Sequence, residues 1–245
     1  MTTDPRVVAA EWRPQHPGRR AAGEILDPII EPDWAGLRVA AAIDQGRAEV
    51  YRYGDRIDVP PPLEAALGNA FGAVGGVIEG HLTRQAFDDG VGVDAAAREA
   101  VPRGIFSMPR LFRRNSKDPY IIGRKHQADE EARALPFLEA LARGEEHAFV
   151  ATDLLWLDGR SLLDFPLLER KRHLEGVLAQ SRLVRVTPFA RPGGSRLAAT
   201  WGRQGFEYIF WRAANSRYRP DAENPDWAVV PSPTHATRGG QQQRD

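Results

Sequence analysis

Residues 37–54 contain a strand–turn–strand pattern, and this pattern restricts the possible folds more than any other feature of the sequence. The apolar run LRVAAAID is followed by the dipeptide QG and then by RAEVYRYG. A short connection with a glycine between two such runs predicts a β-hairpin. The sequence also predicts strands at 75–83, 147–159, 183–190, 206–214 and 226–230, and helices at 61–72, 126–143, 165–180 and 193–204. Because strands and helices are mixed irregularly, this order favours an α+β fold over a repeating βαβ pattern.

Composition excludes several classes of protein. The chain of 245 residues has no cysteine, which rules out disulfides and thiolate metal sites. Its formal net charge is +0, so any contact with nucleic acid must come from a local basic patch. No apolar run reaches the roughly 18–20 residues of a membrane span, and the N-terminus lacks the apolar core of a signal peptide. We therefore expect a cytoplasmic protein with no membrane partner.

The pattern predicts one main domain with flexible ends. Residues 1–23 are rich in proline and arginine and are expected to form a flexible arm. Residues 24–231 are expected to form the domain, with an irregular, basic insertion at 84–125. Residues 232–245 are too polar to pack and are predicted to be a disordered tail. The helix predicted at 126–143 contains Pro136, where a kink is expected.

Six segments occur in an order that resembles a known enzyme family. They read EPDWAGLR (31–38), VYRYGDR (50–56), VIEGHLT (77–83), ATDLLWLDGRSLLDFPLLERKRHLE (151–175), GFEYIFWRAANSRYRP (205–220) and PDWAVV (225–230). This series resembles the adenylation domain of ATP-dependent DNA ligases and is most similar to the ligase domain of bacterial end-joining ligases. The resemblance implies a nucleotidyltransferase fold, with antiparallel sheets around a cleft and flanking helices. It also implies ATP and magnesium as the cofactors of the family.

The position of the family's nucleophile differs in this sequence. Family members have a Lys-x-Asp-Gly segment whose lysine attacks the α-phosphate of ATP. Here the segment reads Asp33-Trp34-Ala35-Gly36, and none of the three lysines of the chain is followed by x-Asp-Gly. A carboxylate cannot form the phosphoramidate. At an effective dielectric constant of about 20, it would also interact unfavourably, by roughly 4 kcal/mol, with a phosphate charge about 4 Å away. We therefore expect no catalytic residue, with Asp33 at the degenerate position.

Other positions implied by the resemblance are also altered. His81 replaces the second carboxylate of an Asp-Gly-Glu strand, and Thr152 replaces the aromatic residue that stacks on adenine. Tyr208 replaces a glycine, and Tyr208 and Trp211 are expected to fill the ATP cleft. Two lysines that normally follow Trp227 are absent. The nucleotide-binding remnant comprises Arg38, Arg52, Glu79, Thr152, Glu207 and Arg212. The alternative is that these residues only hold strand ends and salt bridges in place.

A metal site is a weaker hypothesis. Glu79 and His81 are two residues apart on a predicted strand, so their side chains point to one face. With Glu207 they form a set of residue types that bind divalent metals, although two residues at strand spacing are weak evidence. We leave the metal open and expect no cofactor, because the family's ATP and magnesium chemistry is predicted to be lost.

The basic segment 103–125 is a candidate for contact with nucleic acid. Basic residues interleaved with aromatic ones suit binding to a phosphate backbone and stacking on bases. The alternative is a solvated loop whose aromatic residues anchor it to the core. The candidates are Arg103, Arg110, Phe112, Arg113, Arg114, Lys117, Arg124 and Lys125.

These observations favour one function and leave two alternatives. The leading hypothesis is a degenerate, non-ligating ligase-like domain that binds DNA or a protein partner in a DNA repair setting. One alternative is a divergent ATP-dependent ligase or nucleotidyltransferase that still binds nucleotide or metal. The other is a purely structural subunit. After Trp227 we expect no OB-fold domain of the kind that follows the adenylation domain in the family.

Overall fold

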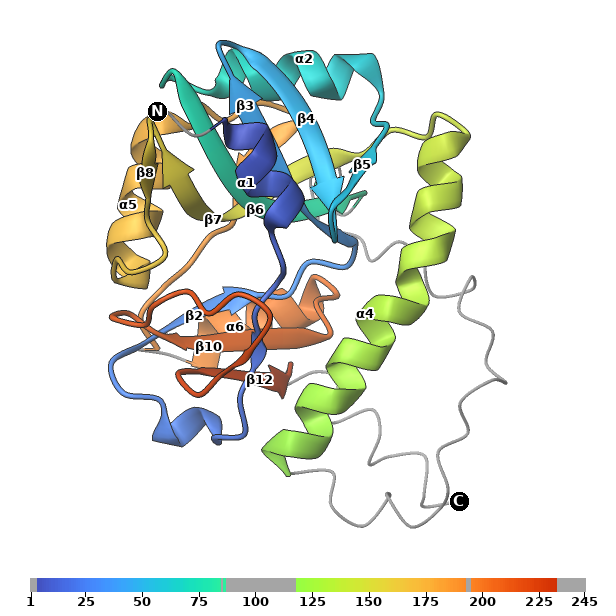
Figure 1. Ribbon diagram of the computed structural model, residues 1–245. Helices are drawn as coiled ribbons and strands as arrows, with labels where there is room; N and C mark the ends of the chain where they lie inside the picture. Colours follow the sequence, from blue (N-terminus) through green and yellow to red (C-terminus); the bar gives the residue numbers. More distant parts are fainter. Residues whose placement is uncertain (1–3, 85, 87–117, 193–194, 233–245) are drawn as a thin grey trace.

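Two antiparallel sheets face each other in the computed structural model, which describes residues 4–84, 86, 118–192 and 195–232 (Figure 1). The larger sheet has seven strands in the order β5-β4-β3-β6-β7-β8, with β9 pairing parallel to β7. The smaller sheet has the order β12-β10-β2, and β1 and β11 form a short parallel pair. The strands of the larger sheet are β3 (Leu37–Asp44), β4 (Arg47–Arg52), β5 (Asp55–Ile57), β6 (Gly75–Thr83), β7 (Ala148–Leu157), β8 (Arg160–Ser161) and β9 (Val184–Val186).

The predicted hairpin is β3–β4. Asp44 pairs with Arg47, and the two turn residues Gln45 and Gly46 both have positive φ, 49° and 77°. This backbone conformation matches the twist of the flanking strands and favours glycine. Side chains then alternate between the two faces of the sheet. Val39, Ala41 and Ile43 enter the main hydrophobic core, whereas Ala40 and Ala42 pack on the opposite face with Val77 and Trp156.

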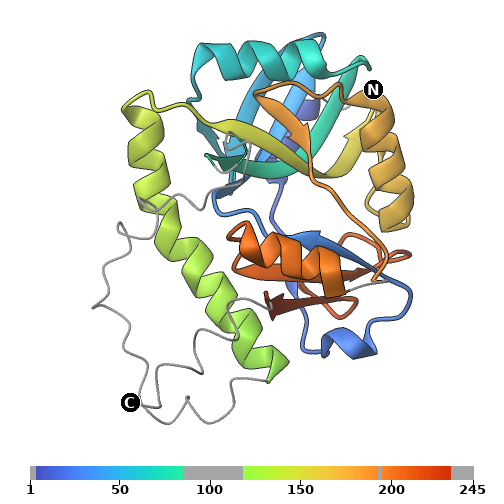
Figure 2. The ribbon, with the colours of Figure 1, turned by 180° about the vertical axis from the view of Figure 1, so that it is seen from behind.

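Helices cover the outer faces of both sheets. Helix α2 (Pro61–Ala70), helix α5 (Leu167–Val177) and the second half of helix α4 (Pro119–Ala142) contribute to the main core of the larger sheet. Helix α6 (Ser195–Arg203) covers the smaller sheet, where Trp201 packs with Trp34 and Ile209 (Figure 2). The smaller sheet consists of β2 (Pro28–Pro32), β10 (Tyr208–Ala213) and β12 (Trp227–Pro231). The α+β fold with facing antiparallel sheets is therefore confirmed.

The N-terminal residues do not form the predicted flexible arm from residue 4 onward. Helix α1 (Pro5–Glu11) begins at Asp4, whose side chain accepts a hydrogen bond from the Arg6 amide, and β1 (His16–Pro17) pairs with β11 (Glu223–Asn224). Trp12 is 5% exposed and donates from its indole nitrogen to the Tyr218 hydroxyl at 2.9 Å. A 3-10 helix, η1 (Ala22–Glu24), follows. The arm prediction was wrong because high proline and arginine content masked the few residues that pack.

Helix α4 begins seven residues earlier than the sequence suggested. The Asp118 side chain accepts a hydrogen bond from the Tyr120 amide at 2.9 Å, and Pro119 occupies the first helical position. A capping aspartate followed by proline is a strong start signal. Residues 118–125 of the predicted irregular insertion are therefore structured, whereas the rest of its basic segment and the predicted tail from 233 lie outside the described residues. None of the helices in the described ranges is long and apolar enough to cross a membrane.

Candidate nucleotide and nucleic-acid site

Asp33 lies directly after β2, where the backbone still pairs with β10. Its amide donates to the Tyr208 carbonyl at 3.1 Å, which directs the side chain into the space between the two sheets. The side chain is 7% exposed, and its Oδ2 lies 3.0 Å from Nε2 of His126 on α4. Asp33 and His126 therefore form a buried contact between the smaller sheet and helix α4.

The Asp33–His126 pair is electrostatically coupled. Burial alone would raise the pKa of Asp33, but the nearby His126, with Arg133 and His81, holds it below its ordinary value. Burial alone would lower the pKa of His126, but Asp33 raises it above its ordinary value. Both shifts favour a charged pair over a neutral one. The imidazole also packs edge-on against Tyr208 and Phe210, with ring centroids at 5.2 and 5.3 Å.

A layer of buried ion pairs fills the rest of the contact between the sheets. Asp153 on β7 and Arg170 on α5 form a two-bond pair, with both nitrogen–oxygen distances 2.8 Å and both side chains 0% exposed. Lys171 pairs with Glu31 on β2 and donates to the Thr152 carbonyl at 2.7 Å. We call this the inter-sheet ionic layer; its members are Glu31, Arg38, Glu79, Asp153, Arg170, Lys171 and Arg212.

Trp227 on β12 lies beside this layer. The guanidinium carbon of Arg212 is 4.1 Å from the centroid of its indole, and that of Arg38 is 5.3 Å away. Arg38 also pairs with Glu79 and donates to the Gln15 carbonyl at 2.8 Å. The two arginines therefore stack on an aromatic side chain of this chain, in an arrangement that favours a cation.

Comparison with known proteins identifies this architecture. No protein-family model matches the sequence. DNA ligase 2 of Methanosarcina acetivorans is 23% identical over 214 residues, which is 82% of this chain and 34% of the ligase. The ligase domain of M. tuberculosis LigD superposes with a TM-score of 0.60 at 19% identity, covering 91% of this chain and 60% of the other. The chain has the fold of the DNA ligase adenylation domain.

Two further solved structures share this ligase fold. Mycobacterial DNA ligase D complexed with ATP and MES gives a TM-score of 0.59 at 18% identity, over 91% of this chain and 60% of that one. A Lig E DNA ligase, described as binding DNA with a minimal scaffold, gives 0.50 at 12%, over 89% and 68%. The chain thus spans about a third of DNA ligase 2 and about three fifths of the LigD chains.

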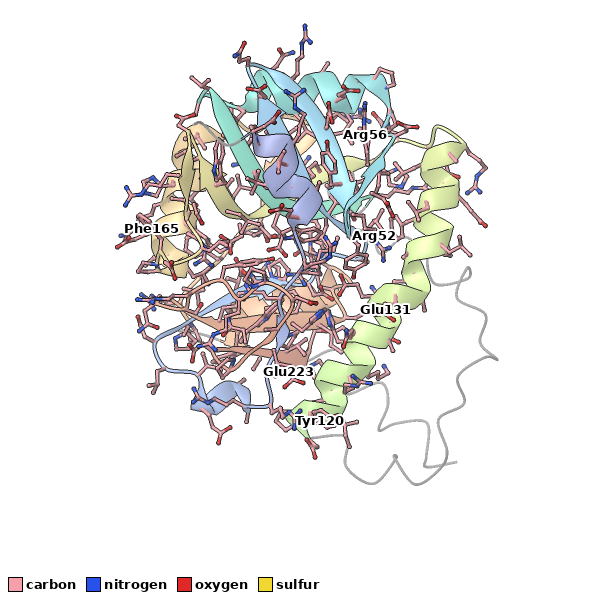
Figure 3. The ribbon with its side chains drawn as sticks, viewed as in Figure 1. Arg52, Arg56, Tyr120, Glu131, Phe165 and Glu223 are labelled. Atoms are coloured by element: carbon pink, nitrogen blue, oxygen red, sulfur yellow. The ribbon has the colours of Figure 1, made fainter. Side chains whose placement is uncertain are left out.

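The structure brings some of the predicted nucleotide-binding residues together and separates others. Arg38, Glu79 and Arg212 meet in the inter-sheet ionic layer, and Thr152 donates from its hydroxyl to the Glu79 carbonyl at 3.2 Å. Arg52 lies apart, at the end of β4 (Figure 3). Its guanidinium stacks on Tyr53, and the residue lines a groove together with Pro60–Pro62. Glu207 also lies apart, since its side chain is 40% exposed and 3.9 Å from Arg133.

The two aromatic residues expected to fill the ATP cleft point in opposite directions. Tyr208 and Phe210 face α4 and the larger sheet, and the Tyr208 hydroxyl is bonded to Lys125 and Asp129, each at 3.1 Å. Trp211 packs with Ile30 on the other face of the smaller sheet. Trp211 therefore does not share the inter-sheet face with Tyr208, because residues three apart on a strand lie on opposite faces.

The weak metal hypothesis is not supported. Glu79 is committed to Arg38, Glu207 lies at the surface, and no group of three potential ligands that could hold a metal occurs among residues 4–84, 86, 118–192 and 195–232. At residue 33, which the sequence resemblance aligns with the family's reactive amine, the structure has a carboxylate bonded to His126, and a carboxylate supplies no amine for reaction with ATP.

The nucleic-acid candidates are only partly covered by the structure. Arg103, Arg110, Phe112, Arg113, Arg114 and Lys117 lie outside the described residues. Arg124 is exposed on the first turns of α4. Lys125 is also exposed, but it donates to the Tyr208 hydroxyl and lies 3.5 Å from Asp129. Of these two, Arg124 is better placed to contact a phosphate.

Sequence reasoning missed His126, Glu31, Arg170 and Lys171 as members of the site. The sequence did contain a signal for Arg170 and Lys171. They occur at helical spacing with Leu167 and Leu174, and all four side chains lie on the buried side of α5. Two adjacent basic residues on an apolar helical face need buried acids as partners. For His126 no such signal existed.

His81 provides a pH-dependent prediction. Burial lowers its pKa to about 4, with Asp33 opposing the shift, so the folded protein holds it neutral. As pH falls below about 6.5, the unfolded chain takes up a proton that the folded chain does not, and stability is lost until about pH 4. Between pH 8 and pH 5 this one residue should cost about 2 kcal/mol of the free energy of unfolding.

Urea denaturation of the wild type and of His81→Leu at both pH values measures this contribution. The variant should lose about 2 kcal/mol less than the wild type on acidification. His173→Leu is the matched control, because His173 is exposed on α5 and should lose as much as the wild type. Equal losses in the wild type and in His81→Leu would contradict the assignment.

Proposed function

We propose that this chain is a ligase-fold domain that does not form an adenylate and acts by binding, with DNA as the partner. The main support for this proposal is the buried pair of Asp33 and His126, at the position that the sequence resemblance assigns to the family's nucleophile. Adenylate formation requires a neutral amine within reach of the nucleotide phosphate. A carboxylate there supplies no such nucleophile, and helix α4 supplies His126 to the same space.

The two described lysines do not replace the missing amine. Lys171 is 1% exposed, and its amino group is already engaged by the Glu31 carboxylate and the Thr152 carbonyl. Lys125 is on the surface of α4, and its neighbours Tyr208 and Asp129 raise its pKa against the effect of burial, which keeps it charged. A protonated amine has no lone pair for attack on phosphorus. Both positions support a binding role over catalysis.

DNA is the proposed partner because of the fold and of the basic segment that leads into α4. A Lig E DNA ligase with a similar fold is described as binding DNA with a minimal scaffold. The segment 103–125 has seven basic residues against one acid, and Arg124 at its end is exposed. We also propose that the chain acts in DNA repair and in the cytoplasm. A protein partner in that repair setting is a further part of the proposal.

A salt titration of DNA binding tests the proposal. Contacts made by arginine to phosphate should give weak, sequence-tolerant binding whose logarithm falls with log salt by about 0.9 per phosphate neutralised. The variant Arg110→Ala/Arg113→Ala/Arg114→Ala should reduce that slope by up to ~3 units, and Arg124→Ala by up to ~1 unit.

Three exposed arginines on other surfaces provide the matched control. Replacing Arg172, Arg182 and Arg191 with alanine removes the same charge and should leave the slope within about half a unit of the wild type. If the two triple variants bind DNA alike, the basic segment is not the contact. If the wild type shows no binding at low salt, the DNA proposal fails.

The second candidate function is nucleotide binding without ligation. It is favoured by Arg38 and Arg212, two buried arginines that remain together beside Trp227. Against it, both are already paired with acids of the chain, Glu79 and Glu31. A nucleotide phosphate would have to displace those carboxylates, so we place this candidate second.

A further inference from the structure

Helix α4 is attached to the rest of the molecule in two different ways along its length. Its second half is anchored by apolar packing, with Ala134, Phe137, Leu138 and Leu141 in the main core. The C-terminus is fixed by hydrogen bonds from the Gly144 amide to the Leu141 carbonyl (2.9 Å) and from the Glu145 amide to the Ala140 carbonyl (3.0 Å). Gly144 has φ 75°, which suits this helix ending.

The first half of α4 rests on the smaller sheet mainly through polar groups. His126 contacts Asp33, and Lys125 and Asp129 both bond the Tyr208 hydroxyl. Ile122 adds an apolar contact to the cluster of Tyr208, Phe210, Trp227 and Val229. This half therefore depends on charge and hydrogen bonding much more than the second half does.

Pro136 lies within the second half, next to where the two modes of attachment meet. Proline has no amide hydrogen, so the Ala132 carbonyl lacks its helical donor, and the ring disfavours a straight helix. Figures 1 and 2 both show α4 changing direction along its length. A bend with one missing hydrogen bond is a point where the first half can move relative to the second.

The Asp33–His126 pair is the titratable part of the contact in the neutral pH range. His81 and His16 have lowered pKa values through burial, with His81 at about 4, and burial raises that of Tyr208 to about 12. The pair is charged above the lowered pKa of Asp33, and it loses the charge on His126 as pH rises through the raised pKa of that residue. The charged or titratable groups that act on the pair are Glu130 and Arg133 from α4 and His81 from β6, and Tyr208 of β10 packs against the His126 ring. Around these lie Lys125 and Asp129, which bond Tyr208, Glu207 beside Arg133, Arg38 of β3 beside His81, and His16 of β1, which interacts with Arg38 and Glu130.

We propose that residues 119–133 of α4 form a hinged lid, held over the smaller sheet by Asp33 and His126 and released at the Pro136 bend as pH rises. Release uncovers the aromatic surface of Tyr208, Phe210 and Trp227, which the lid covers in the structure. The charged pair holds the lid closed, because a neutral His126 leaves the buried carboxylate of Asp33 without its nearest counter-charge. This inference does not depend on DNA binding.

Hydrogen–deuterium exchange of the whole chain at pH 6 and pH 9 tests the lid, with rates corrected for intrinsic exchange. Amides of residues 122–133 should be protected at least tenfold more strongly at pH 6 than at pH 9. Amides of residues 137–143 should keep the same protection at both pH values, because apolar packing anchors them.

Variants of the pair make the test specific. Asp33→Asn and His126→Gln should each give, at pH 6, the weaker protection that residues 122–133 of the wild type show at pH 9. His173→Gln, which changes an exposed histidine on α5, should behave as the wild type. Two results would overturn the proposal: equal protection of residues 122–133 at both pH values in the wild type, or loss of protection in both halves together. If a variant fails to fold, the comparison of the wild type at pH 6 and pH 9 is sufficient to test the lid.

Discussion

Replacing Arg170 with methionine should lower the free energy of unfolding by about 3–5 kcal/mol, close to the whole stability of a marginal domain. Arg170 and Asp153 are both 0% exposed, and the guanidinium also donates to the Phe165 and Ser216 carbonyls. Methionine replaces the apolar stem of the side chain but not its guanidinium, and it leaves Asp153 as an uncompensated buried charge. The loss therefore comes mainly from the remaining carboxylate.

Urea denaturation of three variants separates this effect from a general effect of losing an arginine. Arg182→Met removes an exposed pair with Glu146, whose side chains are 65% and 53% exposed, and should cost less than about 1 kcal/mol. The double variant Arg170→Met/Asp153→Leu removes both buried charges and should recover part of the loss. If Arg170→Met is no more harmful than Arg182→Met, the inter-sheet ionic layer does not stabilise the fold as described.

Local patterns were sufficient to predict most of the secondary structure. The hairpin at 37–54 follows from a glycine turn between two strand-like runs, and β6, β7 and β10 follow from their apolar runs. The face of each residue on β10 could also have been predicted, since Tyr208 and Phe210 share one side and Trp211 takes the other. The fold was predicted from the resemblance of six segments, and the structural relatives confirm it.

Contacts between distant residues could not be predicted in the same way. Asp33 and His126 are 93 positions apart, and nothing near either residue specifies the other. The same holds for Glu31 and Lys171, which meet only because α5 packs under β2 and β7. The prediction of a flexible N-terminal arm was wrong for a related reason. Trp12 and Gln15 are buried only because the fold brings them to their distant partners Tyr218 and Asn224.

The second prediction with a large expected effect is that the chain forms no covalent adduct with ATP. The wild type should show no covalent nucleotide, whereas a ligase of this fold with its lysine would be labelled. Asp33→Lys alone should also stay unlabelled. The new amine would face His126. The sequence resemblance also aligns Thr152, which offers no flat surface for adenine, with an aromatic residue of the family.

The absence of adenylate formation is tested by incubating the full chain with magnesium and ATP labelled in the α-phosphate, followed by denaturation and peptide mapping. We expect no protein-bound label at any lysine, with an active ATP-dependent DNA ligase labelled in parallel as the positive control. Label that survives denaturation and maps to Lys117, Lys125 or Lys171 would show that another amine has taken the catalytic role and that the chain is not a purely binding domain.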